Sequence, residues 1–389
     1  MAVTVNSFAK INLGLCIGAL RPDGFHELRT VYQTIALNDV ISVQVGAGTG
    51  IEIRCSDPRV PKDQSNTCHQ IVERATNVLK VPGKVIIDID KRLPVQGGLG
   101  GASSNAVAVL LALERALEKS LPAIQKLRLA AEVGSDLPLF MFGGTIMGVG
   151  RGEEVYPLPD LPPTTCVVAT PEIAVSTPKA FADWDLVTAS PRDVPTVPMQ
   201  EEPVSGVPKA VYFHGRRLRK PAADPLGSTP RAKDTQLDAR VSGGVDIAPK
   251  LTPATPSDRI LEFGRAISSV LTASFQSKVK SGKHLSGVSA GKSRGRAEIL
   301  LLDLVRTGIE NDFERVVFSQ YPELREVKGV LEGAGAQYAS LSGSGSAVYG
   351  LFGSRAAAQK AAAALRKEGV PAQVTATLTR EQYWKRIFD

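Results

Sequence analysis

The sequence predicts an α+β protein with two lobes, and three observations lead to this prediction. At 389 residues the chain exceeds the usual size of one hydrophobic core, and a hydrophobic content of 43% is enough for two. The N-terminal third alternates strand-like runs with turns. The C-terminal part mixes helical periodicity with strand-like runs. We expect an N-terminal lobe over residues 1–160 and a C-terminal lobe over residues 161–389.

The apolar pattern of the N-terminal part predicts three helices and six strands. Residues 67–80 show helical spacing, and a second helix follows a glycine run and continues to about residue 119. A third is expected over 122–133, because Pro122 suits a helix start. The strand-like runs are 3–8, 11–19, 31–37, 41–45, 51–54 and 84–90.

The middle of the chain changes composition abruptly. Eleven of the 26 prolines fall between about residues 183 and 257, and periodicity is lost there. We expect a largely disordered insertion, and a second one at 277–296, which is rich in Lys, Gly and Ser. Helical periodicity is visible at 260–275 between them. Beyond the insertions the pattern predicts helices at 297–307, 312–321, 322–332 and 354–368, and strands at 337–342, 347–352 and 372–375.

Charge and cysteine content argue against several classes of protein. The net charge of +7 arises from residues 205–240 and 276–296, which carry +5 and +6 and leave about −4 for the rest. These basic tracts do not interleave aromatic residues, so we expect no specific nucleic-acid binding. The four cysteines show no metal-ligand or disulfide spacing, and no apolar run reaches membrane-spanning length. We therefore expect a cytoplasmic protein that has no membrane partner.

The segment from Gly97 to Asn105 places a glycine run against the start of an apolar helix. Glycines allow close backbone approach, and the free amides at a helix N-terminus attract anions, so the segment is a candidate phosphate site. No Lys-Ser/Thr pair follows the glycines, and the dinucleotide fingerprint lacks its third glycine. Ser103 and Ser104 can cap the helix or contact a metal ion. The alternative is an ordinary glycine turn with a capped helix.

Three further features can supply the chemistry. Alternation along the first strands directs Lys10 and Asn12 to one face, whereas a solvated strand lysine is the alternative. Asp136 follows a helix and can be a base or merely a turn or cap residue. The turn at 342–346 can form a second wall around phosphates or be an ordinary hairpin turn. A lysine, a carboxylate and a phosphate loop together are what phosphoryl transfer to an alcohol requires.

The chain resembles the GHMP small-molecule kinases. The resemblance is carried by the segments 7–13, 21–28, 94–106, 311–314 and 342–346. It implies a two-lobed fold, with an N-terminal lobe like domain 2 of ribosomal protein S5 and a ferredoxin-like C-terminal lobe. The details resemble members that act on a small alcohol linked to cytidine diphosphate. Phe25 stands where tyrosine is usual, Ala102 interrupts the glycines, and the two insertions are additional.

The resemblance also implies a role for each matching residue. Asp136 becomes the catalytic base and Lys10 its charged partner, while Asn12 contacts the alcohol part of the substrate. His26 reads the cytosine edge, and Phe25 and Phe181 stack on the ring. ATP and Mg²⁺ are the expected cofactors, with Ser103 or Ser104 as the metal contact. The residues expected to bind ATP are Pro94, Val95, Gln96, Gly97, Gly98, Leu99, Gly100, Gly101, Ala102, Ser103 and Ser104.

Two other functions remain open at this point. A GHMP kinase acting on homoserine, mevalonate or a sugar has no cytosine to read, so the Phe25-His26 pair argues against it. A catalytically silent binding protein on the same scaffold is the second alternative. Retention of both Lys10 and Asp136 argues against silence.

Overall fold

The computed structural model describes residues 2–188, 259–260, 263–265, 267 and 310–389. The predicted helix at 297–307 and the insertion at 277–296 lie outside these residues. The predicted helix at 260–275 and the insertion at 183–257 lie mostly outside them. None of the helices in the described ranges has the length and apolar character needed to cross a bilayer.

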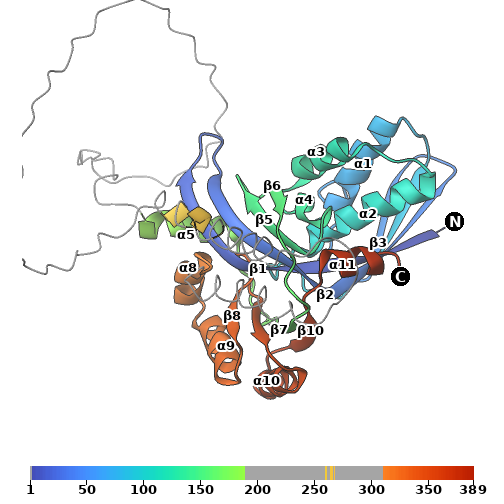
Figure 1. Cartoon of the computed structure of the whole chain (residues 1–389). Helices are drawn as coiled ribbons and strands as arrows, with labels where there is room; N and C mark the ends of the chain where they lie inside the picture. Colours follow the sequence, from blue (N-terminus) through green and yellow to red (C-terminus); the bar gives the residue numbers. More distant parts are fainter. Residues whose placement is uncertain (1, 189–258, 261–262, 266, 268–309) are drawn as a thin grey trace, which may run out of the picture. The chain divides into compact units, whose positions relative to one another are not determined.

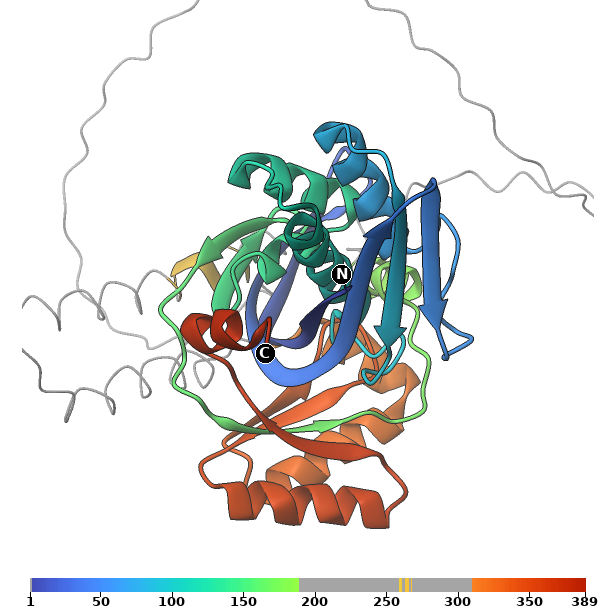
Figure 2. The same cartoon turned by 90° about the vertical axis from the view of Figure 1, so that its right-hand side faces the viewer.

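The N-terminal part is built on a six-stranded sheet with the order β3-β4-β2-β5-β6, in which β1 also pairs with β2. All neighbours are antiparallel except β3 and β4. The predicted runs at 3–8 and 11–19 form one long strand, and those at 31–37 and 41–45 form another. Register shifts replace the predicted breaks, so the two strands bend without ending (Figure 2). The bounds are β1 Ala2–Leu20, β2 His26–Gly46, β3 Gly50–Cys55, β4 Lys84–Asp90, β5 Thr145–Val149 and β6 Glu154–Pro157.

Helices cover the apolar face of this sheet. The helices α1 (Thr67–Leu79), α2 (Gly101–Leu117) and α3 (Ala123–Val133) fulfil the sequence prediction to within a residue or two at each end (Figure 1). A short helix α4 (Leu137–Phe140) follows, and the C-terminal α11 (Arg380–Arg386) contributes Tyr383 to the same core cluster. Helix α2 is apolar nearly all round because it lies between the sheet and other helices.

The C-terminal part is built on a four-stranded antiparallel sheet with the order β10-β7-β9-β8. Helices α9 and α10 cover one of its faces (Figure 2). The observed bounds confirm the predicted helices and strands from residue 312 onward. The elements of this part are β7 Thr165–Ala169, α5 Thr177–Thr188, α8 Phe313–Gln320, α9 Pro322–Gly333, β8 Tyr338–Leu341, β9 Val348–Phe352, α10 Arg355–Lys367 and β10 Ala372–Ala376.

A separate hydrophobic cluster joins the two sheets. Ile11 and Leu13 of β1 pack in it with Val168 of β7 and Tyr349 of β9. The Tyr349 hydroxyl donates to the carbonyl oxygen of Asn12 at 2.6 Å. The polar side chains of Lys10 and Asn12 alternate with these apolar ones, so the same strand that forms the junction presents the candidate active-site residues.

Several elements were not predicted from the sequence. Strands β5, β6 and β7 are only four or five residues long, and α4 has a single turn. Helix α5 was also missed, and it continues to Thr188, whereas the predicted insertion began at residue 183. The three strands and α4 are too short to show a clear periodicity, whereas α5 has 12 residues but is only weakly amphipathic.

Candidate active site

Lys10 and Asp136 lie together although 126 positions separate them in the chain. Lys10 Nζ is 3.4 Å from Asp136 Oδ2. The lysine side chain is 4% exposed and the aspartate side chain 32%, so the pair has a buried cation and a carboxylate that solvent reaches. Asp136 precedes α4 but its carboxylate caps no helix. Lys10 is therefore not a solvated strand lysine, and the Asp136 side chain does not act as a helix cap.

Asn12 extends the polar group along β1. Lys10 Nζ donates to Asn12 Oδ1 at 2.7 Å, and Asn12 Nδ2 donates to Thr30 Oγ1 at 2.8 Å. The Thr30 hydroxyl in turn donates to the carbonyl oxygen of Gly14 at 2.7 Å. All these side chains are buried, and each hydrogen bond fixes the next group. This series of hydrogen bonds holds the ammonium group of Lys10 in one position beside Asp136.

Tyr32 is a site residue that sequence reasoning missed. Its hydroxyl donates to Asp136 Oδ1 at 3.1 Å, and Lys10 Nζ lies 5.6 Å from the centre of its ring. Burial, followed by the nearby Asp136 charge, raises the pKa of Tyr32 well above its usual range, so the hydroxyl stays protonated and donates. Tyr32 lies two residues after Thr30 on β2, the strand that pairs with β1, and nothing in the sequence marked it as a site residue.

The glycine loop leads into α2 as expected for an anion site. Gly100 is the N-cap in a left-handed conformation (φ 71°), no side chain caps the helix, and its first turn has no acid. An added Cβ at Gly98 (φ 77°) would overlap the carbonyl oxygen of Ser342. The backbone amide of Lys10 donates to the Leu99 carbonyl at 3.0 Å. The loop, the helix dipole and the lysine strand therefore meet at one place.

The turn at 342–346 is packed directly on the glycine loop. Ser342 Oγ donates to the carbonyl oxygen of Gly98 at 3.0 Å. The backbone amide of Ala347 donates to the carbonyl oxygen of Gly97 at 3.0 Å. Asn311 Nδ2 secures the turn from behind by donating to the carbonyl oxygens of Leu341 and Gly343. The two turns thus lie against each other, and a role of 342–346 toward phosphates stays a prediction.

The segment before the glycines is anchored by Asp39, a fully buried residue that the sequence did not single out. Its carboxylate accepts from the backbone amides of Arg92 and Leu93, both at 2.7 Å, and from Lys91 Nζ at 2.7 Å. Of the predicted ATP-binding residues that follow, Pro94 and Val95 are partly buried and Gln96 is exposed with a positive φ. Gly101 is partly buried, and Ala102 is exposed in the first turn of α2.

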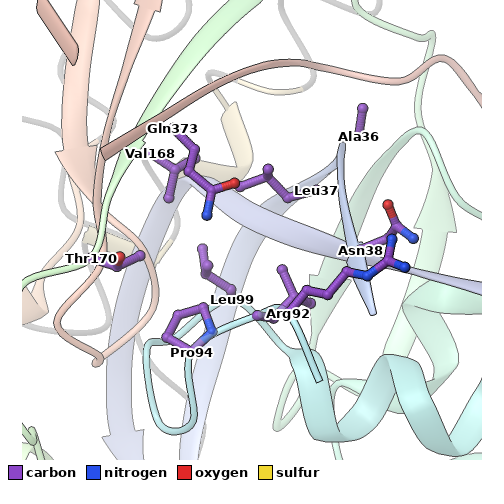
Figure 3. Close-up of a pocket in the computed structure, with 10 residues that line it drawn as sticks. Ala36, Leu37, Asn38, Arg92, Pro94, Leu99, Val168, Thr170 and Gln373 are labelled. Carbon is purple, nitrogen blue, oxygen red and sulfur yellow. The ribbon is translucent and has the colours of Figure 1, made fainter. Parts of the chain in front are cut away.

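A pocket of about 230 Å³ adjoins this segment (Figure 3). Arg92, Pro94 and Leu99 form one side of it. Roughly 300–1,000 Å³ is usual for small-molecule sites, so the pocket is too small for a whole nucleotide. Leu93 belongs to the same segment, and the other lining residues come from β2, from β7 and the residue after it, and from β10, namely Ala36, Leu37, Asn38, Val168, Thr170 and Gln373.

The two serines predicted as metal contacts differ in their surroundings. Ser104 is buried, donates to the carbonyl oxygen of Phe8 at 2.6 Å and accepts from Ser7 Oγ at 2.7 Å. The Ser103 hydroxyl is partly exposed and forms no hydrogen bond with any described residue. Within the described ranges no three His, Cys, Asp or Glu side chains gather as metal ligands. Mg²⁺ needs no such cage when nucleotide phosphates supply its ligands.

The predicted base-binding residues are His26, Phe25 and Phe181. In the structure His26 and Phe181 lie together, and Phe25 lies in more exposed surroundings. His26 is 7% exposed and stacks on Phe181, with ring centres 5.0 Å apart and planes 10° apart. Phe25 is 50% exposed, and the guanidinium carbon of Arg151 lies over its ring, 4.9 Å from the ring centre. His26 Nε2 lies 2.7 Å from Asp185 Oδ1, a contact absent from the sequence prediction.

A Lys–Asp pair lies beside two glycine turns and the start of an uncapped helix, an arrangement that suits a small-molecule kinase. The chain matches the GHMP kinases N terminal domain over residues 66–144 and the GHMP kinases C terminal domain over residues 297–371. It is 30% identical over 351 residues to 4-diphosphocytidyl-2-C-methyl-D-erythritol kinase of Solibacter usitatus (strain Ellin6076), covering 90% of this chain and 81% of that protein. The chain belongs to this family of GHMP kinases.

A second relative agrees with this assignment, and a solved structure shares the fold. The kinase of the same name from Chlorobium phaeovibrioides (strain DSM 265 / 1930) is 30% identical over 375 residues, with 96% of this chain and 95% of that protein covered. A crystal structure of 4-(cytidine 5'-diphospho)-2C-methyl-D-erythritol kinase matches with a TM-score of 0.59 at 24% identity, over 96% of this chain and 98% of that one. At that identity the likeness shows the fold alone, and it confirms the predicted two-lobed architecture.

Proposed function

We propose that this chain transfers the γ-phosphoryl group of ATP to the 2-hydroxyl of 4-diphosphocytidyl-2-C-methyl-D-erythritol, a step of the non-mevalonate route to isoprenoid precursors. The observation that carries the proposal is the Lys10–Asp136 pair, with Nζ and Oδ2 3.4 Å apart, next to the glycine loop. Family membership supplies the substrate, because the relatives are named for it.

The residues have distinct tasks in this reaction. Asp136 accepts the hydroxyl proton as the oxygen forms its bond to the phosphorus and the bond to ADP breaks. Lys10, held by Asn12, orients Asp136 and offsets the negative charge that develops during transfer. The amides at the start of α2 suit the phosphates of ATP, because no side chain caps them and no acid repels an anion.

Mg²⁺ is part of the proposal. Its ligands would be chiefly nucleotide phosphates and water, with the free hydroxyl of Ser103 as the protein contact. Ser104 is the weaker candidate because its hydroxyl already donates to Phe8 and accepts from Ser7. Such an ion neutralises phosphate charge during transfer.

The substrate test compares ADP release with the cytidylylated methylerythritol, homoserine and mevalonate in the presence of Mg²⁺ and ATP. We expect turnover with the first substrate alone, and its loss in Asp136→Ala. Turnover on homoserine or mevalonate instead would keep the kinase class but refute the substrate. No turnover on any of them would favour a binding protein.

A further inference from the structure

His26 is held by a carboxylate as well as by a ring. The imidazole lies at the start of β2, where its strand pairs with Leu20. Its Nε2 is 2.7 Å from Asp185 Oδ1. Asp185 belongs to α5, 159 positions away, and is 51% exposed, whereas the histidine side chain is 6% exposed. A buried ring is therefore fixed by an exposed acid from another element.

This contact determines which ring nitrogen carries hydrogen. An ionised carboxylate only accepts hydrogen bonds, so Nε2 must be the donor. In the neutral ring Nδ1 then has a free lone pair. Nδ1 forms no hydrogen bond with any described residue, and it is not completely shielded from solvent.

The ring plane is fixed as well as the tautomer. Phe181 stacks on the imidazole, and Phe313 meets Phe181 edge-on with centres 4.9 Å apart. Helix α5, which carries Asp185, is anchored by Trp184, which is 1% exposed. Arg259 lies 5.6 Å from the centre of the Trp184 ring. The direction in which Nδ1 points is thus set by packing before any ligand binds.

We propose that Asp185 is a specificity-determining positioning residue, which holds His26 as its Nε2–H tautomer so that Nδ1 accepts a hydrogen bond from the exocyclic amino group of cytosine. Uracil has a carbonyl oxygen at that position, and two acceptors repel each other. The contact therefore selects a cytidine over a uridine diphosphate alcohol. This inference rests on the proposed function, because it deals with the base of the same substrate.

A neighbouring acid provides a matched control. Asp183 lies two residues earlier in α5, and its carboxylate pairs with Lys179 at 2.7 Å and with Gln320. It makes no contact with His26. Removing Asp183 changes the charge of the same helix by the same amount without touching the tautomer of the histidine.

The kinetic test measures kcat/KM for the cytidine substrate and for its uridine counterpart. We expect wild type and Asp183→Ala to share one cytidine preference. In Asp185→Ala that preference falls about tenfold, chiefly through the KM for the cytidine substrate, because one hydrogen bond loses its fixed partner. Asp185→Asn retains most of it, since an amide oxygen still accepts from Nε2–H. An unchanged preference in Asp185→Ala overturns the inference, as does a lower KM, which would make Asp185 an obstacle to substrate.

A spectroscopic test is independent of catalysis. The chain has four histidines, so the ¹⁵N ring signals of His26 can be assigned by comparison with His26→Gln. We expect the Nε2–H tautomer in the wild type at pH 7.5 and a mixture of tautomers in Asp185→Ala. An imidazolium or an Nδ1–H ring in the wild type would overturn the inference.

The two proposals fail in different ways. Absence of wild-type turnover with the cytidine substrate refutes the proposed function, and the NMR result still decides the tautomer. Wild-type turnover with equal efficiency on the cytidine and uridine substrates leaves the kinase intact and refutes the role of Asp185.

Discussion

The ammonium group of Lys10 lies 3.4 Å from the carboxylate of Asp136, and a tyrosine hydroxyl donates to the same carboxylate. Replacing Asp136 with Asn keeps the shape but removes the base. We expect kcat to fall by about 10²–10⁴-fold with little change in the KM for ATP, since general base catalysis is typically worth this much. Steady-state ADP release measures both constants. Activity within threefold of wild type would contradict the role of Asp136.

Tyr32→Phe isolates the hydrogen bond to Asp136 while keeping the buried ring. We expect kcat to fall roughly three- to tenfold, because the carboxylate loses one of the two groups that orient it. The ring still fills its place beside Gly148 and Gly152, so the melting temperature should change little. A large loss of stability with normal kcat would assign Tyr32 to folding alone.

Gly98→Ala tests the contact between the two glycine turns. The new Cβ would overlap the Ser342 carbonyl oxygen at a backbone φ of 77°, so the loop must move. We expect the KM for ATP to rise by about tenfold or more, as misplacement of a binding loop weakens every contact it makes. Titration of ATP against initial rate measures this.

Gly335→Ala is the matched control for this substitution. Its φ is 89°, yet an added Cβ would meet nothing within 4 Å. It therefore carries the left-handed backbone cost of about 1–2 kcal/mol without the steric overlap. An equal KM for ATP in Gly98→Ala and wild type would show that the loop contact does not shape the nucleotide site.

Arg259→Met leaves the buried carboxylate of Asp312 without its cation. Asp312 is fully buried and its second oxygen accepts from the Ile17 amide at 2.8 Å. We expect a loss of about 3–5 kcal/mol in the free energy of unfolding at pH 7, the usual result of breaking a buried pair. Urea denaturation measures this loss, and Arg259→Met with Asp312→Asn should recover part of it.

The same variant should be less destabilised in acid. Burial raises the pKa of Asp312 in the folded chain, so the folded state binds its proton more tightly than the unfolded one. Stability from such a group is gained as pH falls through the folded pKa and lost as pH rises through it. If the loss in free energy of unfolding caused by Arg259→Met grew as the pH fell, the destabilisation could not be due to the unpaired charge of Asp312.

The four cysteines should be unreactive in the folded protein. All are buried, and burial raises the pKa of Cys16 and of Cys68 from 9.0 to about 12. Native protein at pH 8 should react with a thiol reagent far more slowly than protein in denaturant. Because the folded pKa of Cys16 and of Cys68 is the higher one, these two thiols lower the stability as pH rises from about 9 to 12. Rapid native labelling would contradict their burial.

Some residues of the candidate site were predicted from the sequence, and others were not. Lys10, Asp136 and the glycine loop carried chemistry recognisable from residue type and spacing, and the structure brings them together. Tyr32 and Asp185 had no such signal, because a tyrosine in a strand and an acid in a helix are ordinary. Phe181 was predicted to stack on a base, and here it stacks on His26. Its role toward the base remains a prediction.

Sequence alone determined the α+β class and most long helices, because periodicity and helix start signals are local. It also indicated the kinase family, through the resemblance of segments such as 94–106 and 342–346 to the motifs of that family. Tertiary structure alone decided that Asp39 anchors the loop, that Asp312 pairs with Arg259, and that Asp185 reaches His26. These contacts join residues 53 to 159 positions apart, and only chain folding selects such partners.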